Sequence, residues 1–206
     1  MSLIIALCGY HNSGKTTLGT YLVKELRERG YKVAVIKSTK EEGNFTDKPG
    51  TDTFRYRESG AEAVGLFQKD LLTLYFTEFP KDEDFLSFLQ NLFWDKDLIL
   101  LEGFKSFPYL PKIWVLKDKE EKEEIKKKYP GIELFIRAED IGISLEFLLS
   151  KLEEKEKTVF LYVNGKEIQL KPFIQKILRE MLFGFLKGLK NIPERISHFE
   201  IKIKFK

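Results

Sequence analysis

Short apolar runs and amphipathic stretches alternate along most of the chain, which predicts strands separated by helices. Five runs have the continuous apolar character of strands that are buried on both faces, namely Leu3–Cys8, Lys32–Lys37, Leu98–Leu101, Ile113–Leu116 and Glu133–Ile136. Helices with one apolar stripe are expected over Lys15–Arg29, over Asp82–Leu92, and from Ser144, which is expected to cap the last of them. This alternation predicts an α/β domain with a mainly parallel sheet and helices on both faces.

The segment between the second and third of these strands has a different pattern. Ser38–Gly50 is polar, rich in turn residues and long for a connection, as functional loops often are. A short helix is expected over Thr51–Ser59, with Thr51 or Asp52 as its N-cap. Ala63–Leu66 and Leu71–Phe76 then predict two short strands around a turn. Farther on, a Glu/Lys-rich helix over residues 118–128 is most simply a solvated face.

The pattern changes again from Lys157 onward. Asn164-Gly165 between two alternating runs is typical of a β-hairpin with a type I′ turn. Pro172 then opens a very apolar helix, and Phe199–Phe205 alternates as a one-sided strand. We therefore predict a nucleotide-binding domain over residues 1–156 and a small β-β-α-β module over residues 157–206, which is expected to pack on the main domain or on another subunit.

Composition narrows the class of protein. The 206 residues include 35 basic and 32 acidic side chains, and a net charge of +3 gives no case for a nucleic-acid binder. The single cysteine, Cys8, is expected to be a small buried residue, and disulfides are excluded. The first strand follows Met1-Ser2 directly, without room for a signal peptide, and no apolar run reaches membrane-spanning length. A cytoplasmic protein with no membrane partner is expected.

The segment after the first strand carries the clearest chemistry. Gly9 to Thr16 fits the phosphate-loop pattern G-x-x-x-x-G-K-S/T, and it lies between a predicted strand and a predicted helix as that motif requires. Gly9 and Gly14 allow the backbone to bend so that N–H groups, including those of Asn12 and Ser13, point at one anion. Lys15 would reach the β- and γ-phosphates, Thr16 would ligate magnesium, and Thr17 would donate to the α-phosphate. A chance match is the alternative, and the flanking elements argue against it.

A second candidate is the acid at the end of the third apolar strand. Glu102 follows Leu98–Leu101 at the carboxyl end of a buried strand, where phosphate-loop proteins place a magnesium-side carboxylate. It could contact magnesium directly, hold a bound water or orient an attacking one. The alternative, a solvated acid at a strand end, is less favoured beside an intact phosphate loop. Lys15 and Glu102 are therefore the candidate catalytic residues, and Thr16 and Glu102 the candidate metal ligands.

Three further stretches carry a family resemblance over residues 1 to about 140. They are Asp47–Ala61 with its Asp-Lys-Pro-Gly-Thr-Asp start, Leu98–Lys105 with Glu102-Gly103-Phe104-Lys105, and Pro111-Lys112-Ile113. In this order, behind an N-terminal phosphate loop, they resemble the MobB family, the adaptor proteins of molybdopterin-guanine dinucleotide biosynthesis. The resemblance implies a GTP-binding P-loop NTPase-like fold, a homodimer, magnesium, weak GTPase activity, and service to the MobA guanylyltransferase that joins GMP to molybdopterin. It leaves open whether molybdopterin itself contacts this chain.

The same resemblance assigns further nucleotide-site residues. By position, Asp47, Asp52 and Arg55 match the family's middle signature, and Lys105 its second acidic motif. The alternative is helix capping by Asp52 and a surface ion pair with Arg55 or Arg57, and for Asp52 alone capping is as well supported as a role at the nucleotide.

Two features depart from the expected patterns. The chain has Lys37-Ser38-Thr39-Lys40 where family members often carry histidines. A guanine-reading N/T-K-x-D element is present only as the fragment Leu116-Lys117-Asp118, so GTP rather than ATP depends on the resemblance. The other function considered is a small P-loop kinase that phosphorylates a metabolite. Arg55 and Arg57 could grip the transferred phosphate there, but no arginine-rich lid is evident.

Overall fold

The computed structural model describes residues 2–39, 47–117, 122–137, 139–156, 159, 161–163 and 166–190. In chain order, the elements are β1 (Leu3–Cys8), α1 (Lys15–Glu28), β2 (Val33–Lys37), α2 (Asp52–Glu58), β3 (Ala63–Phe67), β4 (Leu72–Phe76), α3 (Asp82–Leu92), β5 (Leu98–Glu102), β6 (Lys112–Leu116), α4 (Lys122–Lys128), β7 (Ile132–Arg137), α5 (Ile141–Glu156), β8 (Leu161–Val163), β9 (Lys166–Ile168) and α6 (Pro172–Lys187).

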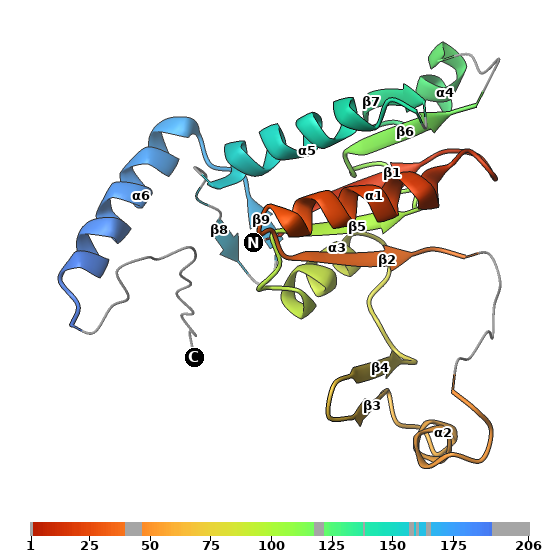
Figure 1. The fold of residues 1–206 in the computed structure, drawn as a ribbon. Coiled ribbons are helices and arrows are strands. Elements are labelled where there is room, and N and C mark those ends of the chain that lie inside the picture. Colours follow the sequence, from red (N-terminus) through yellow and green to blue (C-terminus); the bar gives the residue numbers. More distant parts are fainter. Residues whose placement is uncertain are drawn as a thin grey trace.

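A five-stranded parallel sheet forms the centre of the molecule (Figure 1). Its strand order is β2-β5-β1-β6-β7, and every pair of neighbours is parallel. Helices lie on both faces, which confirms the predicted fold class. From β1 the chain crosses to one edge of the sheet at β2, and from β5 it crosses to the other edge through β6 and β7. In open parallel sheets the carboxyl ends of the strands at such a reversal are the usual ligand-binding edge.

Successive residues of the central strands face opposite layers, as the pleat requires. On one face Ile5 and Leu7 of β1 pack under α1 and α5, together with Leu18, Leu22 and Leu148 of those helices. On the other face Ala6 and Cys8 pack with Leu89 of α3 and Ile125 of α4. The predicted burial of Cys8 is confirmed, because its side chain has no exposed surface and its thiol donates to the carbonyl of Gly103 at 2.8 Å.

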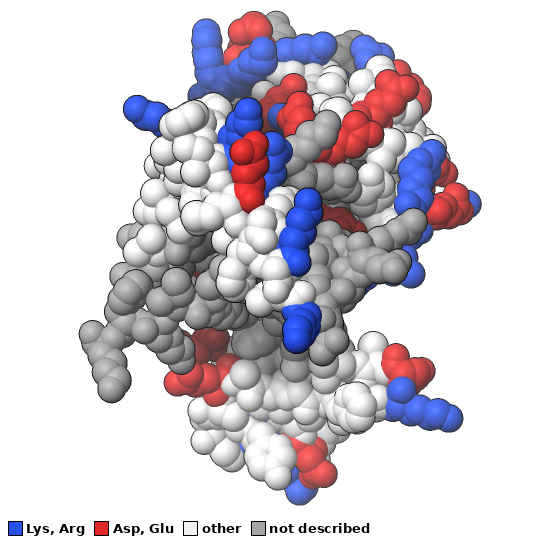
Figure 2. Space-filling view, turned by 90° about the vertical axis from the view of Figure 1, so that its left-hand side faces the viewer, with Lys and Arg blue, Asp and Glu red and all other residues white. Residues whose placement is uncertain are grey.

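The segment between β2 and α3 leaves the sheet and forms a small lobe from α2, β3 and β4. The two strands pair antiparallel, from Ala63 with Phe76 to Phe67 with Leu72, so the predicted hairpin is confirmed. Figures 1 and 2 show the lobe below the main body, and residues other than Lys, Arg, Asp and Glu make up most of the surface it presents in Figure 2. An edge-to-face ring contact of 5.2 Å between Phe76 and Phe88 of α3 connects the lobe to the body. The sequence did not predict that this segment would stand apart from the sheet.

The C-terminal part begins after α5, which ends at Glu156. Leu161–Val163 and Lys166–Ile168 pair as the expected antiparallel hairpin, whose Asn164-Gly165 turn lies outside the described residues. Helix α6 starts at Pro172 as predicted and lies away from the sheet in Figure 1. The predicted strand over Phe199–Phe205 also lies outside the described residues, so the division at residue 156 stays a prediction. Within the described ranges, no helix combines the length and apolar character needed to cross a membrane.

One sequence-based detail of the helices is corrected, and one pair of alternatives is decided. Ser144 does not cap the last helix of the main domain, because α5 begins three residues earlier, at Ile141, and the Ser144 hydroxyl instead donates to the Ile141 carbonyl at 2.7 Å. Capping of α2 falls to Thr51 and not to Asp52, since the Thr51 hydroxyl accepts from the N–H of Phe54 at 3.3 Å. In both cases the residue types were appropriate, and the position of the first helical turn decided between neighbours.

Candidate functional site

The loop between β1 and α1 has the backbone conformation that a phosphate cradle needs. Gly14, the residue before α1, is left-handed with φ 86°, and Asn12 also has a positive φ of 57°. Gly9 has φ 148°, and a Cβ there would lie 2.6 Å from both the Ser13 hydroxyl and the Val115 carbonyl. The first N–H groups of α1 have no partners within the helix, and they lie at the positive end of its dipole. This loop can therefore bind a phosphate through backbone groups.

Lys15 lies across this loop. Its ammonium donates to the Tyr10 carbonyl at 2.5 Å and is 3.4 Å from the Ser13 hydroxyl. Partial burial lowers the pKa of Lys15 below its ordinary value, and the Glu102 carboxylate opposes that shift. Because a phosphate group would supply the negative charge that this environment lacks, Lys15 is suited to bind one.

Glu102 joins the loop to the neighbouring strand. Its Oε1 accepts a hydrogen bond from the Thr16 hydroxyl at 2.8 Å and lies 3.1 Å from the ammonium of Lys37. A hydroxyl and a carboxylate at the end of a phosphate loop are oxygen donors of the kind that magnesium prefers, with phosphate and water oxygens completing the shell. No group of three or more His, Cys, Asp or Glu side chains among the described residues could hold a metal by itself. The donor set thus fits a magnesium ion that arrives with a nucleotide.

The turn after Glu102 directs a second lysine toward the same loop. Gly103 and Phe104 both have positive φ values, 103° and 43°, and the Gly103 N–H donates to the Leu7 carbonyl. The Lys105 ammonium lies 5.3 Å from the ring centre of Tyr10 in the phosphate loop, and 5.5 Å from that of Tyr129. Positive φ at a bulky residue is uncommon and occurs most often at functional turns. The turn thereby places a cation beside the phosphate loop.

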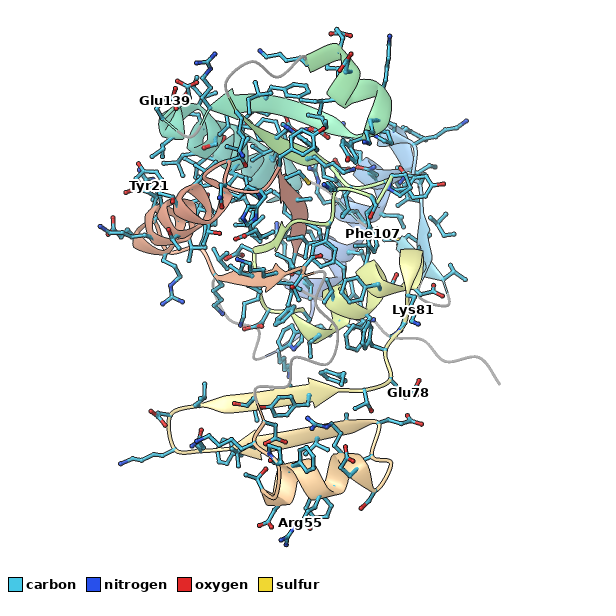
Figure 3. The ribbon with its side chains drawn as sticks, turned by 90° about the vertical axis from the view of Figure 1, so that its right-hand side faces the viewer. Tyr21, Arg55, Glu78, Lys81, Phe107 and Glu139 are labelled. Atoms are coloured by element: carbon cyan, nitrogen blue, oxygen red, sulfur yellow. The ribbon has the colours of Figure 1, made fainter. Side chains whose placement is uncertain are left out.

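A hollow of about 520 Å³ opens beside the phosphate loop. Asn12, Ser13 and Gly14 form one side, and the ends of β6 and β7 form the other, with Leu116, Lys117, Arg137 and Glu139. Figure 3 looks onto the carboxyl ends of the strands and labels Glu139 there. The hollow is large enough for a planar base, and it has both a cation and an acid in its lining.

Most of the sequence-predicted residues come together at this edge of the sheet. Gly9, Asn12, Ser13, Gly14, Lys15, Thr16 and Thr17 are continuous in the loop and the first turn of α1, and the contacts described above bring Glu102 and Lys105 to it.

Asp47, Asp52 and Arg55 are placed in the lobe instead. Asp47 is buried, accepts from the hydroxyls of Thr51 and Thr53, and lies 3.8 Å from the buried Arg57 guanidinium. Asp52 and Arg55 are exposed on α2 and 3.9 Å apart, and Figure 3 shows Arg55 pointing away from the main body. Within this chain these three residues are separate from the phosphate loop, so their assignment to the nucleotide stays a prediction.

Sequence reasoning missed three contributors to the site. Lys37 was noted only as a departure from the family pattern, and its contact with Glu102 depends on the pairing of β2 with β5. Arg137 and Glu139 gave no signal, because Arg137 ends the last strand of the sheet, Glu139 follows it, and neither matches a motif. On the side of the hollow formed by β6 and β7, the fragment Leu116-Lys117-Asp118 was the sequence feature that pointed to lining residues.

Known proteins resemble the chain in both sequence and structure. The sequence model of the family described as "MobB: Molybdopterin guanine dinucleotide synthesis protein B" matches residues 4–137. A Haemophilus influenzae protein named molybdopterin-guanine dinucleotide biosynthesis adapter protein is 35% identical over 146 residues, which cover 69% of this chain and 76% of that protein. A Methanocaldococcus jannaschii protein whose name assigns it to the same adapter class is 28% identical over 228 residues, which cover 92% of each chain.

Solved structures agree with the sequence matches. The crystal structure of a molybdopterin-guanine biosynthesis protein B is 28% identical, has a TM-score of 0.53, and covers 73% of this chain and 99% of that one. Bacillus subtilis MobB, at 24% identity, has a TM-score of 0.55, with 72% of this chain and 97% of that chain covered, and supports the fold alone. With the family match spanning most of the main domain and the phosphate loop intact, the chain belongs to the MobB family, molybdopterin guanine dinucleotide synthesis protein B.

Proposed function

We propose that this protein binds GTP and magnesium at the phosphate loop and acts as an adapter in the biosynthesis of molybdopterin guanine dinucleotide. Its partner would be the MobA-type guanylyltransferase, and its own GTPase activity would be weak. The observation that carries the proposal is the 2.8 Å hydrogen bond between Thr16 and Glu102, which joins the phosphate loop to a strand-end carboxylate in a chain of this family.

The contacts of the phosphate loop suggest how a triphosphate would bind. Backbone N–H groups at the start of α1 would receive the phosphate oxygens, and Lys15 would exchange the Tyr10 carbonyl for the β- and γ-phosphates. Thr16 and Glu102 would hold magnesium, which neutralises charge on the phosphates when bound. Binding would require side-chain rotations at Lys15, Thr16 and Lys37, without movement of the sheet. The site is therefore largely preformed.

The hollow beside the loop favours a base with donors on its pairing edge. Guanine presents N1–H and N2–H groups there, and the Glu139 carboxylate in the lining could accept from both. Adenine has an acceptor at N1, which would face the same carboxylate unfavourably. The stem of Lys117 would cover one face of the base. GTP is thus favoured over ATP by the chemistry of the lining as well as by family membership.

The kinase alternative is less well supported by where the arginines lie. Arg57 is buried in the lobe, with its guanidinium 4.9 Å from the ring centre of Phe54 and close to Asp47. Arg55 lies on the exposed surface of α2. A kinase needs mobile cations at the transferred phosphate, and neither arginine is in that position.

The homodimer is proposed to form through the open face of β3 and β4. By alternation, that face carries the exposed residues Ala63, Gly65, Phe67, Leu72 and Leu74, and Phe67 is 83% exposed. Phe76, at the edge of the same face, packs on Phe88 instead. These side chains include no charged group, so a surface that complements them must itself be apolar. A second copy of the same face is such a surface, and the two copies would be related by a two-fold axis. If so, Leu74→Lys should yield a monomer by light scattering, whereas the exposed charge reversal Arg55→Glu on α2 should leave a dimer. A wild-type monomer at high concentration would exclude this interface.

Nucleotide titrations test the proposal directly. A fluorescent GTP analogue should bind with magnesium and be displaced by GTP more readily than by ATP. Lys15→Ala should weaken binding by about 10- to 100-fold through loss of a charge-assisted contact. Lys24→Ala, on the exposed side of the same helix, is the matched control and should bind normally. Equal affinity of the Lys15 and Lys24 variants would remove the phosphate loop from the proposal.

Two further measurements separate adapter from enzyme. Glu102→Gln should retain GTP binding and reduce magnesium-dependent hydrolysis, because the amide is a poorer magnesium ligand. The adapter role predicts that the purified guanylyltransferase binds this protein and that GTP changes the affinity. Rapid phosphoryl transfer to a small acceptor, without binding to that enzyme, would favour the kinase instead.

A further inference from the structure

Lys37 and Glu102 form a pair at the carboxyl ends of neighbouring strands. Lys37 is the last residue of β2 and Glu102 the last of β5, and the two are direct partners in the parallel register. The Lys37 ammonium lies 3.1 Å from Oε1 of Glu102. The Thr16 hydroxyl donates to that same oxygen at 2.8 Å. One carboxylate oxygen thus holds both an ammonium and the hydroxyl expected to ligate magnesium.

The side chains of Lys37 and Glu102 differ in how freely they can rotate. The Glu102 side chain is 12% exposed, and its position is fixed by the Thr16 contact and by the pairing of its own strand, β5, with β1. The Lys37 side chain is 62% exposed and carries its charge on a flexible four-carbon stem. The ammonium can therefore leave Glu102 by side-chain rotation, with no movement of the sheet.

Lys15, the lysine of the phosphate loop, has other partners than Glu102. The Lys15 ammonium donates to the Tyr10 carbonyl and lies near the Ser13 hydroxyl. Lys15 is thus directed along the loop, and within the described part of the chain Lys37 is the lysine in ion-pair contact with Glu102.

We propose that Lys37 holds the place of the divalent cation at Glu102 and competes with magnesium for that carboxylate. The inference rests on the proposed nucleotide site. An ammonium 3.1 Å from the oxygen that would ligate magnesium opposes the metal, because the two cations repel each other at short range. Withdrawal of Lys37 therefore favours magnesium binding. Lys37 raises the magnesium concentration that the site requires and keeps Glu102 neutralised and in position when no metal is bound.

Metal titrations of a charge-removing variant test this competition. Lys37→Met keeps the length and apolar stem of the side chain and removes the ammonium. With GDP present, free and bound Mn²⁺ are measured by electron paramagnetic resonance, and Mg²⁺ is then used to displace the bound Mn²⁺. We expect the half-saturating metal concentration to fall by about two- to fivefold, the range for a partly exposed ion pair. Lys37→Gln is a second neutral variant and should behave alike.

A matched control separates the local contact from the change in net charge. Lys32 lies just before the opposite end of β2, has a similarly exposed side chain, and lies 4.0 Å from Asp95 rather than near Glu102. Lys32→Met removes the same charge and should leave the metal titration unchanged, and Lys37→Arg should resemble the wild type. An unchanged or increased metal requirement in Lys37→Met would overturn the inference while leaving the nucleotide site intact. Absence of metal-dependent binding of both GDP and GTP in the wild type would overturn both.

Discussion

Gly9 is the residue at which the shape of the phosphate loop is most sensitive to a single added carbon. A Cβ at this position would lie 2.6 Å from the Ser13 hydroxyl and 2.6 Å from the Val115 carbonyl, whereas ordinary contact begins at 3.4 Å. Val115 is fully buried in β6, which pairs with strands on both sides. Its carbonyl cannot retreat, so the Gly9→Ala variant must either keep the loop under strain or displace it.

The expected loss of stability has two parts. A φ of 148° is strained for a residue with a side chain and costs about 1–3 kcal/mol. Overpacking against a fixed backbone carbonyl costs a further 1–3 kcal/mol or so. Their sum is about 4 kcal/mol at mid-range. Gly30→Ala is the matched control, because its φ of 88° is also positive and nothing lies within 4 Å of its Cβ position. It should lose only about 1–2 kcal/mol.

Urea unfolding and nucleotide titration measure the two consequences. If the loop keeps its shape in Gly9→Ala, the unfolding midpoint should fall well below that of Gly30→Ala. If the loop relaxes, stability is recovered but the cradle is lost, and GTP affinity should fall while Gly30→Ala binds normally. A Gly9→Ala protein that matches Gly30→Ala in both midpoint and affinity would refute the reasoning.

Three other predictions follow from buried ionisable groups. Burial lowers the pKa of Lys15 and a bound phosphate would raise it again, so GTP binding should take up protons at alkaline pH and weaken as the pH rises past the lowered pKa. Calorimetry in two buffers of different ionisation enthalpy measures this proton uptake, and proton release on binding would contradict the prediction. Burial raises the pKa of Cys8 to about 12, so iodoacetamide should label this single thiol only as fast as the protein unfolds. The buried Lys112 ammonium donates to the carbonyls of Phe107, Leu110 and Pro130. Lys112→Met should lower the free energy of unfolding in urea by about 2 kcal/mol, because those carbonyls lose their donor. A variant as stable as the wild type would mean that the cost of burying the ammonium equals the stabilisation from its hydrogen bonds.

Local sequence determined the elements and the centre of the site. Apolar runs bounded by turn residues give β1, β5 and β6, since a strand covered on both faces is apolar over most of its length. The phosphate loop follows from its own residues, because the positive φ of Gly14, the lysine and the hydroxyl are all local requirements. Even the hairpin of the lobe was predictable, as its alternation lies within one short segment.

Contacts between distant segments were decided by the tertiary structure. The sequence placed Glu102 at a strand end, but only the order β2-β5-β1 brings Thr16 and Lys37 to the same carboxylate oxygen. The family position assigned Asp47 to the nucleotide, which stays a prediction, and only the structure shows its contact with Arg57 inside a lobe that stands apart from the sheet. The physical reason is common to both. Hydrophobic periodicity specifies which face of an element is buried and not which element will cover it, so strand order and lobe placement depend on packing that no local pattern records.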